Sequence, residues 1–263
     1  MKTIRLLALF VYLVLFFTSY ANAQEIKTET IYHPKLPNED LNIAKSHLTD
    51  LLYQEATPGL KNYPKKVLVF DDRFEMVYKK SSRIIKFSDI LNPIVVTKRS
   101  QGSSYNKYIS LVLKNNAYRD NLYVFDDNTL KDLADHLFYF QHKLNKIRYD
   151  SLANIFKPVA TQYCALKVKP QVLEEQRKYI VQANMFNQQK AYEKAVELYK
   201  KVIEIDQVAY PAAYSNLALL SAQVEDYDAA IYNMKLYLML EPESVGVRSC
   251  QDKIYEWEAQ ISK

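Results

Sequence analysis

An internal repeat of 35 residues in the C-terminal third constrains this chain more than any other feature. Seven positions in the first copy align with positions 35 residues later. The aligned pairs are Tyr179 and Tyr214, Ala183 and Ala218, Phe186 and Ser221, Tyr192 and Tyr227, Ala195 and Ala230, Tyr199 and Met234, and Val202 and Tyr237. A fixed period of this length is typical of helix–turn–helix units that stack side by side.

These positions resemble the tetratricopeptide repeat (TPR), a helix–turn–helix unit normally of 34 residues. The resemblance covers about residues 171–242. It implies repeats at about 176–210 and 211–244, with a capping helix at 245–261, in a TPR module spanning 171–263. The first repeat departs from the family pattern, because Gln182 replaces the usual Leu and Gln207 the usual Pro.

In the TPR family, the first helix of each repeat lines a concave face that receives a partner segment. The resemblance therefore implies that this face buries Ile180 and Leu219 against a partner and hydrogen-bonds it through Asn side chains. With Asn184 in an open groove, Asn184→Ala is expected to be nearly neutral for stability. The implied partner-binding residues are Arg177, Ile180, Asn184, Asn187, Gln188, Ser215, Asn216, Leu219, Ala222 and Gln223. The alternative is that two repeats only stabilise the neighbouring domain.

Residues 65–125 have a different pattern, with short runs of β-branched and aromatic residues between polar turns. This pattern predicts an antiparallel sheet, closed or sandwiched. The predicted strands are Val67–Phe70, Phe74–Tyr78, Arg83–Phe87, Pro93–Lys98, Lys107–Leu113 and Asn121–Phe125. A helix is predicted to begin at Asp127 or Asn128, because apolar residues then recur at helical spacing. Its stripe is Leu130, Leu133, Ala134, Leu137, Phe138, Phe140, Gln141 and Leu144.

Six strands closed by one helix resemble the pleckstrin-homology-like fold over about residues 65–147, with Ile84–Ile90 similar to a strand and turn of bacterial members. The predicted fold class is therefore α+β: a pleckstrin-homology-like β barrel or sandwich with a closing helix, followed by an all-α TPR array. Residues 148–170 are predicted to be a linker. Residues 24–64 form an N-terminal segment with an amphipathic helix at 38–56.

Residues 1–23 have the pattern of a secretory signal peptide. Lys2 and Arg5 precede an apolar run from Leu6 to Phe17, and Ala21-Asn22-Ala23 supplies the small residues of a cleavage site. The run is shorter than the ~20 residues that a spanning helix needs, which disfavours an uncleaved anchor. We expect a mature chain from Gln24, exported to a bacterial periplasm or beyond, without a transmembrane span.

Positive charge is concentrated in one segment of a chain whose net charge is +5. Residues 61–119 hold thirteen Lys or Arg against four Asp or Glu. Pleckstrin-homology-like domains that bind lipid headgroups use basic residues at such turns, so the resemblance implies an alternative function, contact with anionic lipid or glycan. The candidate anion-binding residues are Lys79, Lys80, Arg83, Lys86, Lys98 and Arg99. The competing interpretation is that these basic residues form a solvent-exposed face that binds nothing.

Catalytic and metal-binding patterns are sparse. The three glycines lie too far apart for a phosphate-binding loop. His136 and His142 are six residues apart, which puts them on different faces of one helix and disfavours a metal pair. Val-Phe-Asp-Asp occurs at 69–72 and 124–127, where turn and helix-capping roles account for the carboxylates. We therefore expect a non-enzymatic protein without metal or cofactor.

Export permits a disulfide, but Cys164 and Cys250 are favoured as free, buried thiols. An exported protein also rarely meets nucleic acid. The predicted function is therefore that of an exported interaction or scaffold protein, which binds a partner segment through the TPR concave face.

Overall fold

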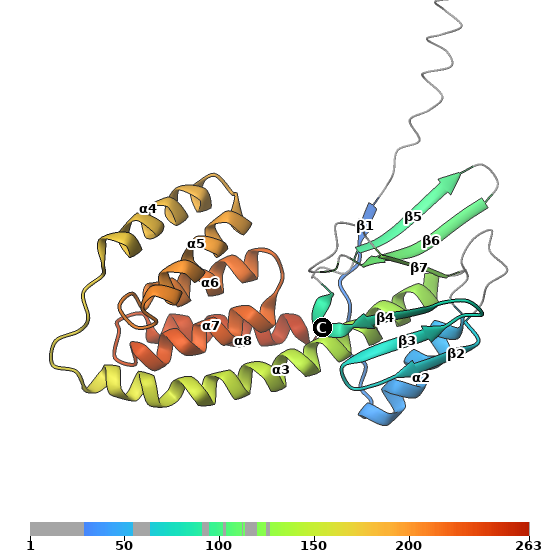
Figure 1. Ribbon diagram of the computed structural model, residues 1–263, viewed down its shortest axis with the longest axis horizontal. Coiled ribbons are helices and arrows are strands. Elements are labelled where there is room, and N and C mark those ends of the chain that lie inside the picture. The colour runs from blue at the N-terminus through green and yellow to red at the C-terminus, as the bar shows by residue number, and fades with distance from the viewer. Residues whose placement is uncertain are drawn as a thin grey trace, which may run out of the picture.

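The computed structural model describes residues 29–54, 64–90, 95–101, 104–111, 113, 120–124 and 127–262. The signal peptide predicted at 1–23 lies outside these residues. The fold is α+β, as expected, with an antiparallel β part and a helical array (Figure 1).

Seven strands of the described residues form two antiparallel sheets. Strands β2 (Lys66–Val69), β3 (Arg73–Val77) and β4 (Ser82–Lys86) form one sheet in that order. The other has the order β1 (Glu29–Ile31), β5 (Val95–Gln101), β6 (Ser104–Leu111) and β7 (Asp120–Val124). All six predicted strands are present, with ends shifted by up to three residues. The sequence pattern missed β1, which is only three residues long and pairs with β5.

The two sheets share one hydrophobic core with helix α2 (Leu41–Tyr53), the short 3-10 helix η1 (Phe87–Asp89) and the beginning of helix α3 (Asp127–Ala165). The Asp40 carboxylate caps α2 by accepting hydrogen bonds from the N–H groups of Asn42 and Ile43, so the cap lies two residues after the start at residue 38 that the sequence predicted. Phe87 stacks on Phe140 at 4.7 Å between ring centroids, which fixes α3 against the sheets.

Helix α3 is 39 residues long and continues through most of the segment predicted to be a linker. Its stripe of apolar residues from Leu130 to Phe140 is buried in the β core, as expected. Beyond residue 147, Phe156, Ala160 and Tyr163 recur at steps of four and three residues and pack on the helical array. The linker prediction therefore holds only for the residues after Ala165.

Pro158 lies inside α3 and does not end it. A proline in a helix removes one backbone hydrogen bond and typically costs ~3 kcal/mol. The carbonyl that loses its hydrogen-bond partner is that of Asn154, four residues before Pro158. Both residues are exposed, so water can donate a hydrogen bond to this carbonyl. Burial of Phe156 and Tyr163 offsets the cost, since each large apolar side chain contributes about 1.5–3 kcal/mol.

The C-terminal part is an array of five helices, α4 (Glu174–Gln188), α5 (Tyr192–Ile205), α6 (Ala212–Gln223), α7 (Tyr227–Leu240) and α8 (Val247–Ile261). The helix α7 begins and ends 35 residues after α5, in agreement with the sequence period. The small residues Ala183, Ala195, Ala218 and Ala230 are fully buried between the helices. In Figure 1, α3 runs along one side of this array, where it contacts α7.

The turns within the two helix pairs repeat the same backbone geometry. Lys190 and Glu225, which are 35 residues apart, have positive φ angles of 58° and 60°. The following N–H groups, of Ala191 and Asp226, donate to the carbonyls of Phe186 and Ser221, each at 2.9 Å. This is the hydrogen bond of a helix end that turns through the left-handed region. The backbone conformation therefore repeats every 35 residues, as the residue types do.

We expect Ala230→Leu to destabilise the array. Ala230 is fully buried with Ala218, Met234 and Trp257, so three additional carbon atoms have no space. Such overpacking typically costs ~1–3 kcal/mol. Thermal and urea unfolding would measure the loss. The matched control is Ala259→Leu on the exposed surface of α8, and equal stability of the two variants would contradict the packing described for Ala230.

Candidate functional site

The exposed face of α6 carries the partner-binding residues predicted for the second repeat. Ala213, Leu217 and Leu220 on the inner side of the helix are buried. Successive helical residues rotate by about 100°, which places Ser215, Asn216, Leu219 and Gln223 together on the opposite side. Leu219 and Gln223 are exposed, and Ser215, Asn216 and Ala222 are half-buried.

Four of the five predicted residues of α4 are exposed, and one is buried. Arg177, Asn184, Asn187 and Gln188 are exposed, as a binding face requires. Ile180, expected on the same face, is instead buried in the core with Ala183, Tyr199 and Leu217. The reason is its helical position, since Ile180 lies one turn from Gln176 and Ala183, which also face inward.

The apolar contribution of α4 comes from two residues that the sequence reasoning did not select. The exposed fractions of Val181, Met185 and Leu219 lie between 43% and 61%. Val181 and Met185 are four residues apart and therefore lie one above the other on α4. The sequence did contain a signal for these two residues, namely an apolar pair at positions i and i+4 on a helix that is otherwise polar. We use the name outer face of α4 and α6 for the surface that carries Val181, Met185 and Leu219 together with the amide side chains of Asn187, Gln188, Asn216 and Gln223.

Asn184 has a structural partner. The hydroxyl of Tyr199 donates a hydrogen bond of 2.6 Å to its side-chain oxygen. Tyr199 is fully buried on α5, and burial raises the pKa of its hydroxyl to about 12. Asn184 therefore satisfies a buried polar group, and on this geometry its replacement is expected to cost stability rather than leave it unchanged.

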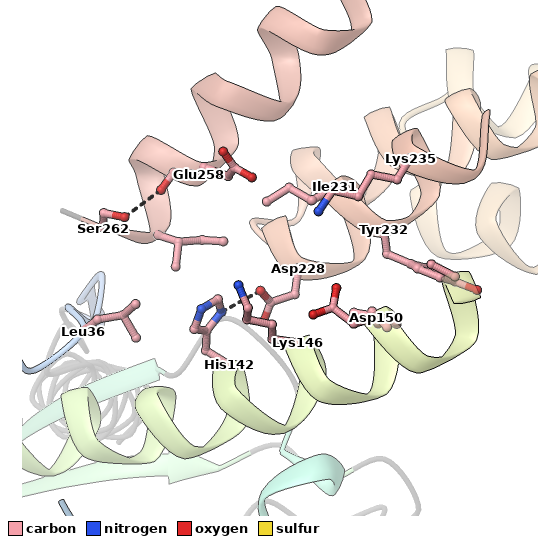
Figure 2. A pocket seen from close by; sticks show the side chains of 13 residues that line it. Leu36, His142, Lys146, Asp150, Asp228, Ile231, Tyr232, Lys235, Glu258 and Ser262 are labelled. Atoms are coloured by element: carbon pink, nitrogen blue, oxygen red, sulfur yellow. Dashed lines mark hydrogen bonds and ion pairs between the residues drawn. The ribbon is translucent and has the colours of Figure 1, made fainter. Parts of the chain in front are cut away.

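A cleft of about 310 Å³ lies where α3, α7 and α8 meet the N-terminal lead-in. Figure 2 shows side chains from all three helices directed toward it, with Leu36 closing one end. The lining includes His142, Lys146 and Asp150 from α3, Asp228, Ile231, Tyr232 and Lys235 from α7, and Glu258, Ile261 and Ser262 from α8. The cleft could not be found from local spacing, because its α3 residues lie more than 70 positions before its α7 residues in the sequence.

The cleft is built around a buried carboxylate. Asp228 accepts hydrogen bonds from His142 Nδ1 at 2.7 Å and from Asn145 Nδ2 at 3.3 Å, which ties α7 to α3. Nearby, Tyr149 stacks on Tyr232 with ring centroids 4.6 Å apart. Two lysines and three carboxylates make the walls almost balanced in charge.

The lining contains one serine and one histidine, and each is held by a hydrogen bond. Ser262 is the only serine in the lining of the cleft, and its hydroxyl donates a hydrogen bond to the backbone carbonyl of Glu258. His142 is engaged with Asp228.

The predicted anion-binding residues divide into two groups. Lys79, Lys80 and Lys86 are exposed on β4 and on the turn before it, without an ion-pair partner in the described chain. Arg83 has a structural role, because its guanidinium donates to the backbone carbonyl of Asn121 at 3.1 Å. Lys98 and Arg99 lie on β5, and their side chains fall outside the described part of the chain.

Both cysteines are free, as favoured from the sequence. Cys164 is exposed rather than buried, and its thiol lies 3.4 Å from the backbone carbonyl of Met239. Cys250 is half-buried, and burial raises the pKa of its thiol.

Comparisons with protein-family models, with curated proteins and with solved structures returned no match to this chain. Among the helices of the described residues, none is both long enough and apolar enough to cross a bilayer. The function therefore has to be inferred from the residues and their geometry.

We expect a double-mutant cycle to reveal the Asn184–Tyr199 hydrogen bond. Asn184→Ala leaves a buried hydroxyl without an acceptor, which typically costs ~1–3 kcal/mol. Tyr199→Phe removes that hydroxyl, so Asn184→Ala added to it should cost little more. Urea unfolding of the parent, the two single variants and the double variant gives the four free energies. Strictly additive losses would show that the two side chains act independently.

Proposed function

We propose that this chain is an exported, non-enzymatic interaction protein whose helical array binds a segment of a partner protein. We assign α4–α5 and α6–α7 as two TPR units and α8 as their capping helix. The 35-residue period and the repeated turn geometry at Lys190 and Glu225 support this assignment. The proposed location is a bacterial periplasm or the exterior, on the basis of the signal-peptide pattern.

The β part is proposed to be a pleckstrin-homology-like domain that holds the array in place. Two antiparallel sheets that share one core with the first half of α3 support this assignment. The fully buried Phe87 and Phe140 make the closing helix part of that core. The β part thus supplies a fixed base for α3.

One observation carries the binding proposal: exposed apolar side chains are set among neutral amides on the outer face of α4 and α6. Val181, Met185 and Leu219 offer apolar surface, while Asn187, Gln188, Asn216 and Gln223 offer hydrogen bonds. A partner segment with an apolar stripe would bury the first group and pair with the second. Arg177 is the only charged side chain among the predicted binding positions, and Lys178, three residues before Val181 on α4, adds a second exposed positive charge.

We expect Leu219→Lys to reduce partner capture without loss of stability. Leu219 is exposed, so a lysine fits there, but its charge would oppose burial against a partner. The measurement is quantitative affinity capture from the exported fraction, with thermal unfolding of each variant alongside.

The matched control is Ile155→Lys, because Ile155 is an exposed isoleucine on α3, away from the outer face. Loss of the same captured protein with Leu219→Lys and its retention with Ile155→Lys would support the proposal. Equal capture by both variants would remove the outer face as the binding surface.

A second candidate function, contact with an anionic surface, is favoured by Lys79, Lys80 and Lys86, which are exposed and have no ion-pair partner among the residues that the structure describes. We expect weak binding to anionic phospholipid vesicles that falls steeply with salt, since the Debye length shrinks from ~10 Å at 0.1 M to ~3 Å at 1 M. The double variant Lys79→Gln/Lys80→Gln should no longer sediment together with the vesicles. The control is Lys253→Gln on α8, which should sediment with them as the parent does. Absence of sedimentation by the parent at low salt would exclude this candidate.

A further inference from the structure

Three side chains outside the outer face and the cleft converge at the contact between α2 and α3. They are Glu39, which precedes the Asp40 cap of α2, His47 on α2 and His136 on α3. Each offers one metal-ligating atom, and these atoms all lie within 4.8 Å of one another. His142, the other histidine of α3, takes no part in this group, because it is bound to Asp228.

The carboxylate of Glu39 lies between the two imidazoles. Its Oε2 is 2.7 Å from His47 Nδ1, and its Oε1 is 2.7 Å from His136 Nε2. The two histidine rings meet edge to face, with centroids 5.7 Å apart. Three donor atoms of the types that bind zinc thus point toward one small region.

The contact between Glu39 and His136 is unusual because it lacks hydrogen-bond geometry. Both Glu39 Oε1 and His136 Nε2 are buried, and neither has a hydrogen-bond partner despite their separation of 2.7 Å. His136 is only 8% exposed. Buried polar atoms are nearly always paired. A contact of 2.7 Å without hydrogen-bond geometry is accounted for by an ion pair when His136 is protonated, and by a cation that both atoms bind when it is neutral.

The other nitrogen of His136 settles which atom is available. His136 Nδ1 lies 2.6 Å from the backbone carbonyl of Asp132, and a carbonyl can only accept a hydrogen bond. Nδ1 therefore carries a proton and donates it, which leaves Nε2 to act as a ligand toward Glu39. A histidine ligand whose second nitrogen donates to a carbonyl is the usual arrangement around a metal, because that bond orients the ring.

We propose that Glu39, His47 and His136 form a Zn²⁺ site that links the N-terminal end of α2 to α3. Two imidazoles and one carboxylate are a ligand set that zinc takes at about 2.0–2.2 Å, and tetrahedral geometry would separate the ligand atoms by about 3.3 Å. The two 2.7 Å contacts, one to each oxygen of Glu39, would widen by about 0.6 Å, and the other ligand separations, which lie within 4.8 Å, would have to adjust to the same spacing. His47 is 54% exposed, so the ion can enter from solvent and keep a water as fourth ligand.

Zinc titration by isothermal calorimetry tests this site on the purified native protein after a chelator has been dialysed away. We expect one zinc ion per chain. His47→Gln, at the exposed ligand, and Glu39→Gln should each weaken binding at least tenfold. His33→Gln is the matched control, since His33 is an exposed histidine paired with Glu225 elsewhere on the surface; it should bind zinc as the parent does.

A second measurement separates a zinc site from a simple ion pair. Because zinc would bind the folded chain, saturating zinc should raise the melting temperature of the parent and of His33→Gln, but not that of His47→Gln. A chelator should reverse the rise. The proposal is overturned if the parent shows no saturable zinc binding, if His47→Gln and Glu39→Gln bind as the parent does, or if zinc leaves the parent's melting temperature unchanged.

Discussion

The continuity of α3 is the constraint on which the rest of this structure depends. Its first half places Leu137 and Phe140 in the core of the β part, and its second half places Phe156 and Tyr163 in a core with α6 and α7. One element therefore forms a wall of two hydrophobic cores. The outer face, the cleft and the three-residue Glu39 group all take their positions from helices that pack on α3 or follow it.

Local patterns in the sequence predicted the elements well where periodicity and turn chemistry agreed. The helices of the array follow the 35-residue period, and the stripe from Leu130 to Leu144 predicted the buried side of α3. The continuation of α3 was missed because a proline such as Pro158 usually ends or kinks a helix. The buried Phe156, Ala160 and Tyr163 show that tertiary packing outweighed the proline.

The candidate sites divide in the same way. The face of α6 could be predicted, because helical rotation alone places Asn216, Leu219 and Gln223 together. Ile180 could not, since its burial depends on the neighbouring helices. His47 and His136 are 89 positions apart and belong to helices that meet only in the tertiary structure, so spacing along the chain carried no information about their pairing with Glu39.

A 39-residue helix extends about 58 Å at 1.5 Å per residue, and α3 is buried in a core near each end. The separation between the β part and the array is therefore set by a rod rather than by a tether. A flexible connection lets two weak contacts find each other over a range of distances, at a cost in entropy. A rod makes both contacts available at one distance only. A ligand that touches both ends of this protein would thus be selected by its length as well as by its chemistry.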